Sequence, residues 1–314
     1  MPVVEICPVC HFILPTGWRT GRAICIAVAG ARTTGKSLYI AVLVRQVELL
    51  CERLGVPMRP VTRDTTVSYV NNYERPLFVE RGLMPSTPTA RTQASYQRVP
   101  LIFSVGSWAG TNRFIVLRDV AGEDLEAGNL RAPYFRFFGN ADAVFFMFDP
   151  LRVQVIRDQL HDLVPPQLWS TGDPGLVLGN LLSAIGEGHP RLAVILTKFD
   201  VLRSLRDVEG SVWSEIMSNA GAPFLRAGSS AGTYDEADGE LLHEGVRSLL
   251  LNLGGGSLVA AVENPTSGVR LPYRYFAVSS LGHAPTGNRL SPRGIAPFRC
   301  TDPLRWVTTR LGVF

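Results

Sequence analysis

The order of apolar and polar residues along the chain predicts strands that alternate with helices. Short, continuous apolar runs, typical of buried parallel strands, occur at 23–29, 113–119, 141–149, 192–200 and 273–278. A further strand is expected at 98–106, joined to the next one by a turn-rich connection at 106–112. This alternation predicts a three-layer α/β/α sandwich with a mostly parallel sheet and the strand ends forming the binding edge.

Apolar residues at helical spacing indicate where the helices lie. From Ile40 to Leu54 they recur every three or four positions, and Gly55 and Pro57 supply a stop signal. Further helices are expected at three places: 176–185, 241–251 and 303–311. Loops are expected in two segments with little helical periodicity and many polar or proline residues: 56–95 and 150–175.

We expect two regions, a short N-terminal segment at 1–22 and one large domain at 23–314. Within the domain, 203–272 is an enlarged connection or insertion before the last strand. A length of 314 residues with 46% apolar composition allows such a domain a sizeable core. The net charge of +4 is scattered, without the basic block typical of nucleic-acid binding, so we expect no nucleic-acid partner.

Two features that the sequence lacks indicate where in the cell the protein is located. No run approaches the roughly 18 apolar residues of a membrane span, and the N-terminus lacks the basic and then apolar pattern of a secretion signal. Five cysteines, an odd number in a long chain, are typical of a reducing compartment. We therefore expect a cytoplasmic protein without direct membrane insertion.

The segment after the first predicted strand matches G-x-x-x-x-G-K-[ST], the loop that wraps nucleotide phosphates. Its backbone N–H groups form an anion-binding nest at a helix N-terminus. Lys36 would bring a positive charge to the β- and γ-phosphates, and the Ser37 hydroxyl would ligate Mg²⁺. The residues expected to bind nucleotide here are Gly30, Ala31, Arg32, Thr33, Thr34, Gly35, Lys36, Ser37 and Leu38.

Two later segments are candidates for magnesium and γ-phosphate contacts. Asp119 ends an apolar strand and can hold Mg²⁺ through water, while the Gly122 amide can reach the γ-phosphate. In the loop before that strand, Thr87, ahead of Thr89 and Thr92, is the candidate to ligate Mg²⁺ only in the triphosphate state. An ordinary threonine-rich surface loop is the alternative.

The sequence Thr197-Lys198-Phe199-Asp200 follows another apolar strand and suits recognition of guanine. The Asp200 carboxylate would accept hydrogen bonds from the guanine N1–H and 2-amino groups. Adenine lacks this donor pair and would leave a desolvated carboxylate unpaired. The stem of Lys198 would pack along the base.

Near the N-terminus, Cys7 and Cys10 with His11 form half of a zinc knuckle. A structural zinc site needs four ligands, usually two such pairs, and the chain has no second C-x-x-C. A zinc ion completed by a ligand from elsewhere and a degenerate remnant of a knuckle both remain open.

Taken in order, these motifs resemble Ras-like (translation-factor-related) P-loop GTPases across 24–282. Ser279, Ser280 and Leu281 then resemble the loop whose backbone amide contacts the guanine oxygen. The finer resemblance is to the bacterial double-GTPase (DO-GTPase type 2) family. Its features are C-P-x-C followed by Leu14-Pro15, the Phe-Asp-Pro step at 148–150, and the tail at 302–306.

This resemblance implies Mg²⁺-dependent binding of GTP and GDP, and hydrolysis with Lys36, Thr87, Gly122 and Glu123 as catalytic residues. It also implies a nucleotide-state switch in a bacterial conflict or signalling system, acting beside a second GTPase or an effector protein. The switch loops at 85–95 and 120–132 would form the surface that changes with the bound nucleotide.

The sequence departs from the family pattern at two positions. Glu123 stands where many relatives have a glutamine that orients water, and its charge beside the γ-phosphate predicts slow hydrolysis. Arg32 would stabilise transition-state charge, point to solvent or pair with an acid. The alternative functions are a GTP-binding interaction module without hydrolysis and, less favoured, an ATP-using P-loop enzyme.

Overall fold

The structure, a computed structural model, describes residues 5–7, 12–82, 84, 88–89, 99–128, 135–160, 173–208, 212–228, 233–266, 268–285, 289–309 and 312. Its strands are β1 (Arg22–Gly30), β2 (Arg59–Pro60), β3 (Leu101–Trp108), β4 (Thr111–Asp119), β5 (Ala143–Phe148), β6 (Arg191–Leu196) and β7 (Tyr273–Ala277). Its longer helices are α1 (Lys36–Arg53), α2 (Arg63–Tyr69), the π-helix η1 (Val70–Val79), α5 (Gln154–Leu160), α6 (Pro174–Ile185), α8 (Val212–Ser218), α9 (Glu236–Asn252), α10 (Gly256–Glu263) and α11 (Asp302–Thr308). Its shorter helices are α3 (Gly122–Glu126), α4 (Phe137–Asn140), η4 (Pro150–Arg152), α7 (Phe199–Leu202), η6 (Arg203–Asp207) and η7 (Pro223–Leu225).

One mostly parallel sheet organises the described residues, in the order β2-β3-β4-β1-β5-β6-β7. β1 pairs in parallel with β4 and β5, and β6 and β7 extend the parallel pairing. β3 is antiparallel to β4, and the short edge strand β2 is antiparallel to β3. The strands from β4 to β7 in this order therefore end at one edge. This confirms the predicted α/β architecture with a mostly parallel sheet.

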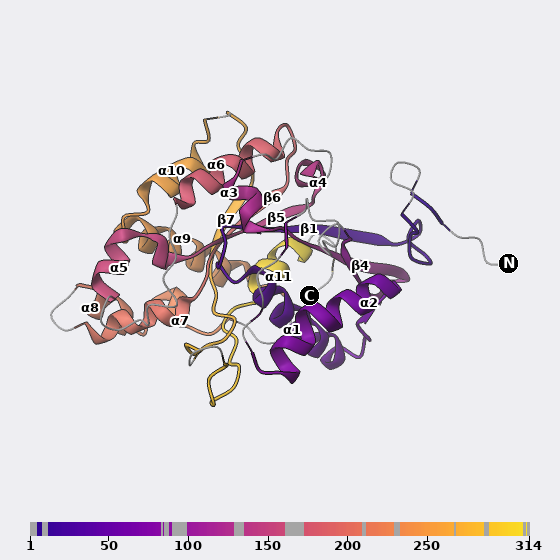
Figure 1. The fold of residues 1–314 in the computed structure, drawn as a ribbon, viewed down its shortest axis with the longest axis horizontal. Helices are drawn as coiled ribbons and strands as arrows, with labels where there is room; N and C mark the ends of the chain where they lie inside the picture. Colours follow the sequence, from indigo (N-terminus) through magenta and orange to yellow (C-terminus); the bar gives the residue numbers. More distant parts are fainter. Residues whose placement is uncertain are drawn as a thin grey trace.

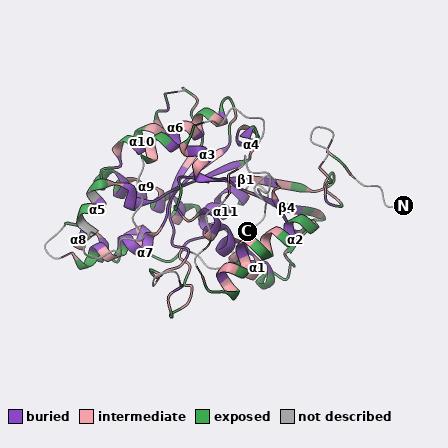
Figure 2. Cartoon of the chain, viewed as in Figure 1, coloured by how far each residue is buried: buried purple, intermediate pink, exposed green. Residues whose placement is uncertain are grey.

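Helices cover both faces of this sheet (Figure 1). In that view α1, α2 and α11 lie below the strands, and α3, α4 and α6 lie above them. Every residue of β5 is buried, and buried residues gather between the helices (Figure 2). Across one face, the ring of Tyr39 on α1 meets Phe145 of β5 edge-on, with 6.3 Å between centroids. The core is thus packed from both sides, as expected for strands that read as continuous apolar runs.

Two segments that the sequence predicts as loops are partly helical. Within 56–95, α2 and η1 follow one another, and the Thr62 side chain caps α2 by accepting the Thr65 N–H at 3.0 Å. Tyr69, Tyr73 and Leu77 recur every four residues and face the core, a helical spacing within a segment whose polar, proline and threonine content indicated a loop. Within 150–175, η4 and α5 are present. The loop predictions are wrong for these parts.

The long connection before β7 packs onto the sheet edge through α9. Arg274 of β7 pairs with Glu236 and Glu240 of α9, each at 2.7 Å, and the Tyr275 N–H donates to His243 Nδ1 at 3.1 Å. The helix predicted at 241–251 is therefore part of a longer one. The division into 1–22 and 23–314, with 203–272 as an insertion, stays a prediction.

Candidate nucleotide-binding site

The predicted site residues follow the strands that share one sheet edge. The phosphate loop follows β1, Asp119 closes β4, and the segments beginning at Thr197 and Val278 follow β6 and β7. The register pairs Val28 of β1 with Asp119 of β4, so the loop and this carboxylate lie at the same level. Ligands of open α/β sheets bind outside these carboxyl ends.

The phosphate loop bends at residues in the left-handed region. Gly35 has φ 85° immediately before α1, a conformation that glycine adopts without a side-chain penalty. Lys36 is buried, and its Nζ donates to the carbonyl oxygens of Gly30 at 3.0 Å and Ala31 at 2.8 Å. Burial lowers the pKa of Lys36 to about 8, against the opposing influence of Asp119 and Glu126. The ammonium is thus held inside the loop that would wrap the phosphates.

Ser37 and Asp119 are brought together, as a magnesium site requires. The Ser37 hydroxyl donates to Asp119 Oδ2 at 2.6 Å, and the Tyr73 hydroxyl donates to the same oxygen at 3.2 Å. Asp119 Oδ1 is buried without a hydrogen-bond partner among the described residues. Burial raises the pKa of Asp119, with Lys36 and the two hydroxyls opposing it. A hard cation would satisfy this oxygen, so the donor set fits Mg²⁺.

Gly122 lies directly against the phosphate loop. A Cβ at this position would come within 2.2 Å of the Arg32 nitrogen, so only glycine permits the approach. From the helix that it begins, Glu123 pairs with the Arg32 guanidinium at 3.2 Å, and Glu126 accepts the Arg32 N–H at 3.0 Å. Of the alternatives for Arg32, the structure shows pairing with an acid.

The segments after β6 and β7 form a second cluster at the same edge. The Ser279 hydroxyl donates to Asp200 Oδ1 at 2.5 Å and accepts the Gly282 N–H at 2.8 Å. The Phe199 N–H donates to the Val278 carbonyl oxygen at 3.2 Å, which ties the two segments together. Burial raises the pKa of Asp200, and the Ser279 hydroxyl opposes that shift. The carboxylate is therefore held in place beside Ser280, which is itself buried, and the half-buried Leu281.

Comparison with known proteins identifies a relative. No protein-family model matches the chain. A protein of Mycolicibacterium smegmatis (strain ATCC 700084 / mc(2)155) with the name "Putative ESX-1 scaffolding and assembly protein SaeC" is 69% identical over 312 residues. The match covers 99% of this chain and 81% of that protein. The chain belongs to the SaeC family.

Among solved structures, the SaeC-family chain matches a bacterial selenocysteine-specific elongation factor EF-Sec at 14% identity and a TM-score of 0.30. The match covers 80% of this chain and 25% of that one. A likeness this low does not assign a fold.

Several contacts of the site are not predicted by the sequence motifs. Tyr73, which bonds to Asp119, lies in a segment that the sequence predicts as a loop. Asp149 is fully buried and pairs with Lys198 Nζ at 2.6 Å. Glu126 and Arg152 join at the phosphate loop. An acid directly after a buried strand was a usable signal for Asp149, whereas the partners of the other three depend on the tertiary fold.

Other predicted residues stay untested. Thr87, Thr92, Cys10 and His11 lie outside the described residues, so the switch threonine and the zinc knuckle remain predictions. Thr89 is half-buried in an irregular stretch, and Cys7 is among the described residues whereas Cys10 is not. The zinc prediction is neither supported nor contradicted.

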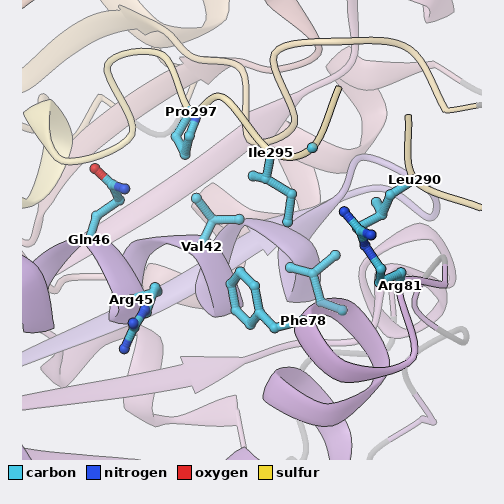
Figure 3. Close-up of a pocket in the computed structure, with 10 residues that line it drawn as sticks. Val42, Arg45, Gln46, Phe78, Arg81, Leu290, Ile295 and Pro297 are labelled. Atoms are coloured by element: carbon cyan, nitrogen blue, oxygen red, sulfur yellow. The ribbon is translucent and has the colours of Figure 1, made fainter. Parts of the chain in front are cut away.

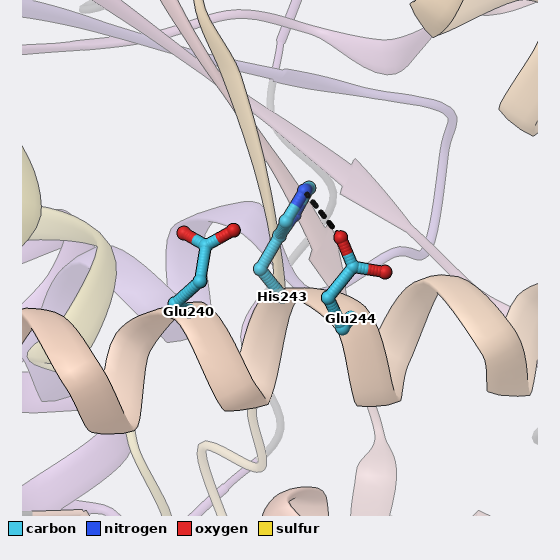
Figure 4. A group of neighbouring side chains, drawn as sticks. All are labelled: Glu240, His243 and Glu244. Atoms are coloured by element: carbon cyan, nitrogen blue, oxygen red, sulfur yellow. Dashed lines mark ion pairs between the residues drawn. The ribbon is translucent and has the colours of Figure 1, made fainter.

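One group of three metal-ligating side chains occurs in the described part of the SaeC-family chain: Glu240, His243 and Glu244 on α9 (Figure 4). His243 Nδ1 accepts the Tyr275 N–H, which leaves the proton of a neutral ring on Nε2, the only nitrogen facing Glu244. Burial lowers the pKa of His243 and favours that neutral form. The group therefore offers no histidine lone pair to a cation.

A hollow of about 300 Å³ lies between α1, η1 and the segment 290–297 (Figure 3). Val42, Phe78 and Ile295 supply apolar lining, and Arg45 and Arg81 lie at its border. Its lining contains no predicted nucleotide-binding residue, so it has no part in the site at the strand ends. Among the described residues, no helix is long and apolar enough to cross a membrane.

Proposed function

We propose that this chain is a Mg²⁺-dependent GTP-binding protein whose nucleotide state controls the assembly of a protein complex. The observation that carries the proposal is the Asp200 carboxylate, oriented by Ser279 at the edge that also holds the phosphate loop. A half-buried carboxylate fixed in this way suits the paired N–H donors of guanine and penalises adenine. The resemblance to Ras-like GTPases supports the same interpretation.

Each part of the chain has a defined task in this proposal. The amides of the phosphate loop and Lys36 bind the phosphates, while Ser37 and Asp119 hold Mg²⁺. When bound, the metal neutralises charge that builds up on the β- and γ-phosphate oxygens. Gly122 places its amide beside the loop, where it can report the γ-phosphate. Lys198 is held by Asp149 with its stem available to the base.

The role in assembly is supported by the relative, which is named as a scaffolding and assembly protein. Protein partners follow directly from such a role. A second GTPase or an effector, as the double-GTPase resemblance implies, is one class of such partner. The resemblance also implies a conflict or signalling system, but the relative's name favours assembly.

Hydrolysis is the second part of the proposal, with GTP converted slowly to GDP and phosphate by in-line attack of water. Glu123 is engaged with Arg32 at 3.2 Å, and this pairing favours the alternative of a GTP-binding module without turnover. Single-turnover measurement of phosphate release separates the two. Slow release that a partner accelerates supports a GTPase, and no release with or without partners supports the module.

Substitution of Asp200 tests the base directly. Asp200→Asn replaces an acceptor with an amide donor, so the preference for GTP over ATP should fall by at least about tenfold. Binding of xanthosine triphosphate should improve, because xanthine carries an oxygen where guanine has its 2-amino group. Asp207→Asn is the matched control, since Asp207 is exposed in the neighbouring helix η6. An unchanged preference in Asp200→Asn would support the ATP alternative.

A further inference from the structure

Arg152 carries a buried positive charge next to the phosphate loop. It ends η4, directly after β5, and its side chain is 2% exposed. Its Nη2 donates to the Arg32 carbonyl oxygen at 2.7 Å. Its Nε and Nη1 are buried without a hydrogen-bond partner among the described residues. Unpaired donors on a buried cation are costly, which indicates that an anionic partner completes them.

An internal anion lies at this position. Glu126 Oε1 accepts the Arg32 N–H at 3.0 Å and lies 3.3 Å from Arg152 Nη2. One carboxylate oxygen thus bridges a phosphate-loop amide and a buried guanidinium. Both Glu126 and Arg152 also influence Lys36 electrostatically, as expected for groups beside the phosphate loop.

Glu126 can leave this position more easily than Arg152 can. Its side chain is 31% exposed, and it is the last residue of the five-residue helix α3. A phosphate group offers three anionic oxygens, more than a carboxylate, and guanidinium groups bind phosphate in a bidentate manner. A terminal phosphate can therefore engage donors of Arg152 that Glu126 leaves unused.

We propose that the Arg152 guanidinium and the Arg32 amide form a subsite for the terminal phosphate of a nucleoside triphosphate, which Glu126 occupies in this structure. This inference rests on the proposed function and adds a regulatory element to it. Triphosphate binding displaces the Glu126 side chain and so releases the contact that holds the end of α3 against the loop. A diphosphate does not reach the subsite and leaves α3 against the loop.

The test compares the affinity of the full chain for a non-hydrolysable GTP analogue and for GDP, both with Mg²⁺. Glu126→Gln removes the competing charge and should raise affinity for the analogue by about tenfold, with GDP changed by less than about twofold. Arg152→Gln should lower affinity for the analogue by about tenfold or more. The exposed residues Glu52 and Arg206 provide matched controls as Glu52→Gln and Arg206→Gln.

A double variant separates the subsite from simple charge repulsion. In the subsite mechanism the gain from Glu126→Gln depends on Arg152, so it should largely disappear in Glu126→Gln with Arg152→Gln. Repulsion alone would preserve the gain in the double variant, and that result would overturn the proposal. Because Arg152 is buried and its variant risks misfolding, Glu126→Asp gives a second test. It keeps the charge but shortens the side chain that bridges the Arg32 amide and Arg152, so the subsite predicts tighter binding of the analogue and repulsion predicts none.

Inorganic tripolyphosphate, which has no base, distinguishes failure of the subsite from failure of the proposed function. If the wild-type chain binds the GTP analogue while the Glu126 and Arg152 variants behave like their controls, the subsite is wrong and GTP binding stands. If the chain binds no guanine nucleotide, thermal stabilisation by tripolyphosphate decides. A larger shift in Glu126→Gln than in wild type supports the subsite, and equal shifts, or none, reject it.

Discussion

Lys36 is a buried cation at the phosphate loop, so its protonation should control how well the proposed site holds phosphate. Burial lowers its pKa to about 8, so the free protein loses this charge within an accessible pH range. Asp119 shows the opposite effect, because burial raises the pKa of its carboxyl. Neither charged group favours folding by itself, because burying a charge lowers the free energy of unfolding. Bound phosphate and Mg²⁺ would compensate these buried charges, which explains why both groups lie at this site.

The pKa of Lys36 predicts the pH dependence of nucleotide affinity. Bound phosphates favour the protonated amine, so its pKa is higher in the complex than in the free protein. Affinity for Mg²⁺-GTP should therefore fall as pH rises above about 8, approaching about tenfold per pH unit. Titration calorimetry at pH values between about 7 and 9 measures this effect. An affinity that is constant across this range would contradict a buried, titrating Lys36 in the site.

Asp119→Asn should separate stability from function. The raised pKa of Asp119 means that its ionised form opposes folding above that pKa, so a neutral amide should raise the free energy of unfolding near pH 7 by about 1–2 kcal/mol. The same change removes a charged magnesium ligand, so nucleotide affinity should no longer depend on Mg²⁺. Thermal unfolding and binding with Mg²⁺ or EDTA check both effects. A destabilised variant that retains full Mg²⁺ dependence would refute this role.

At the scale of elements, the strands are the most predictable part of the molecule. Continuous apolar runs such as the one in β5 are local signals, and every predicted strand is present within a few residues of its expected bounds. The two-residue edge strand β2 was not predicted, because it lies in a segment expected to be a loop. The π-helix η1 escaped prediction because its segment is rich in polar residues and contains Pro76, a residue type that ordinarily interrupts helices. Tyr73, Arg152 and Glu126 escaped as site residues because their partners are 26 to 120 residues away in the chain. Motifs identify residues that face a ligand, whereas their supports depend on the tertiary fold.

Another long-range contact joins the end of the chain to α9. Arg299, whose side chain is 1% exposed, pairs with Asp238 of α9 at 2.8 Å and with Asp302 of α11 at 2.7 Å. Breaking a buried ion network leaves uncompensated charges, so Arg299→Met should lower the free energy of unfolding by about 3–5 kcal/mol. The exposed pair of Arg206 and Asp207 gives the control, because Arg206→Met should cost less than about 1 kcal/mol. Urea unfolding measures the free energy lost in each variant. Equal losses in Arg299→Met and Arg206→Met would contradict this role of the buried network.

At the scale of the whole molecule, both clusters of candidate residues lie along one sheet edge, and helices cover both faces. The phosphate loop meets Asp119 and α3, and the segments after β6 and β7 meet at Asp200. A nucleotide across this edge would contact both clusters, with α3 as the element that responds to the terminal phosphate. Under the proposed role in assembly, such a movement would change the surface offered to partners.

Equilibrium binding of the purified chain to fluorescent GTP, GDP and ATP, each with Mg²⁺ and with EDTA, tests the central claim most directly. The account predicts that GTP and GDP bind at least about tenfold more tightly than ATP, and that EDTA weakens GTP binding. Binding of all three nucleotides with equal affinity, or of none, would contradict a guanine-nucleotide switch at this sheet edge.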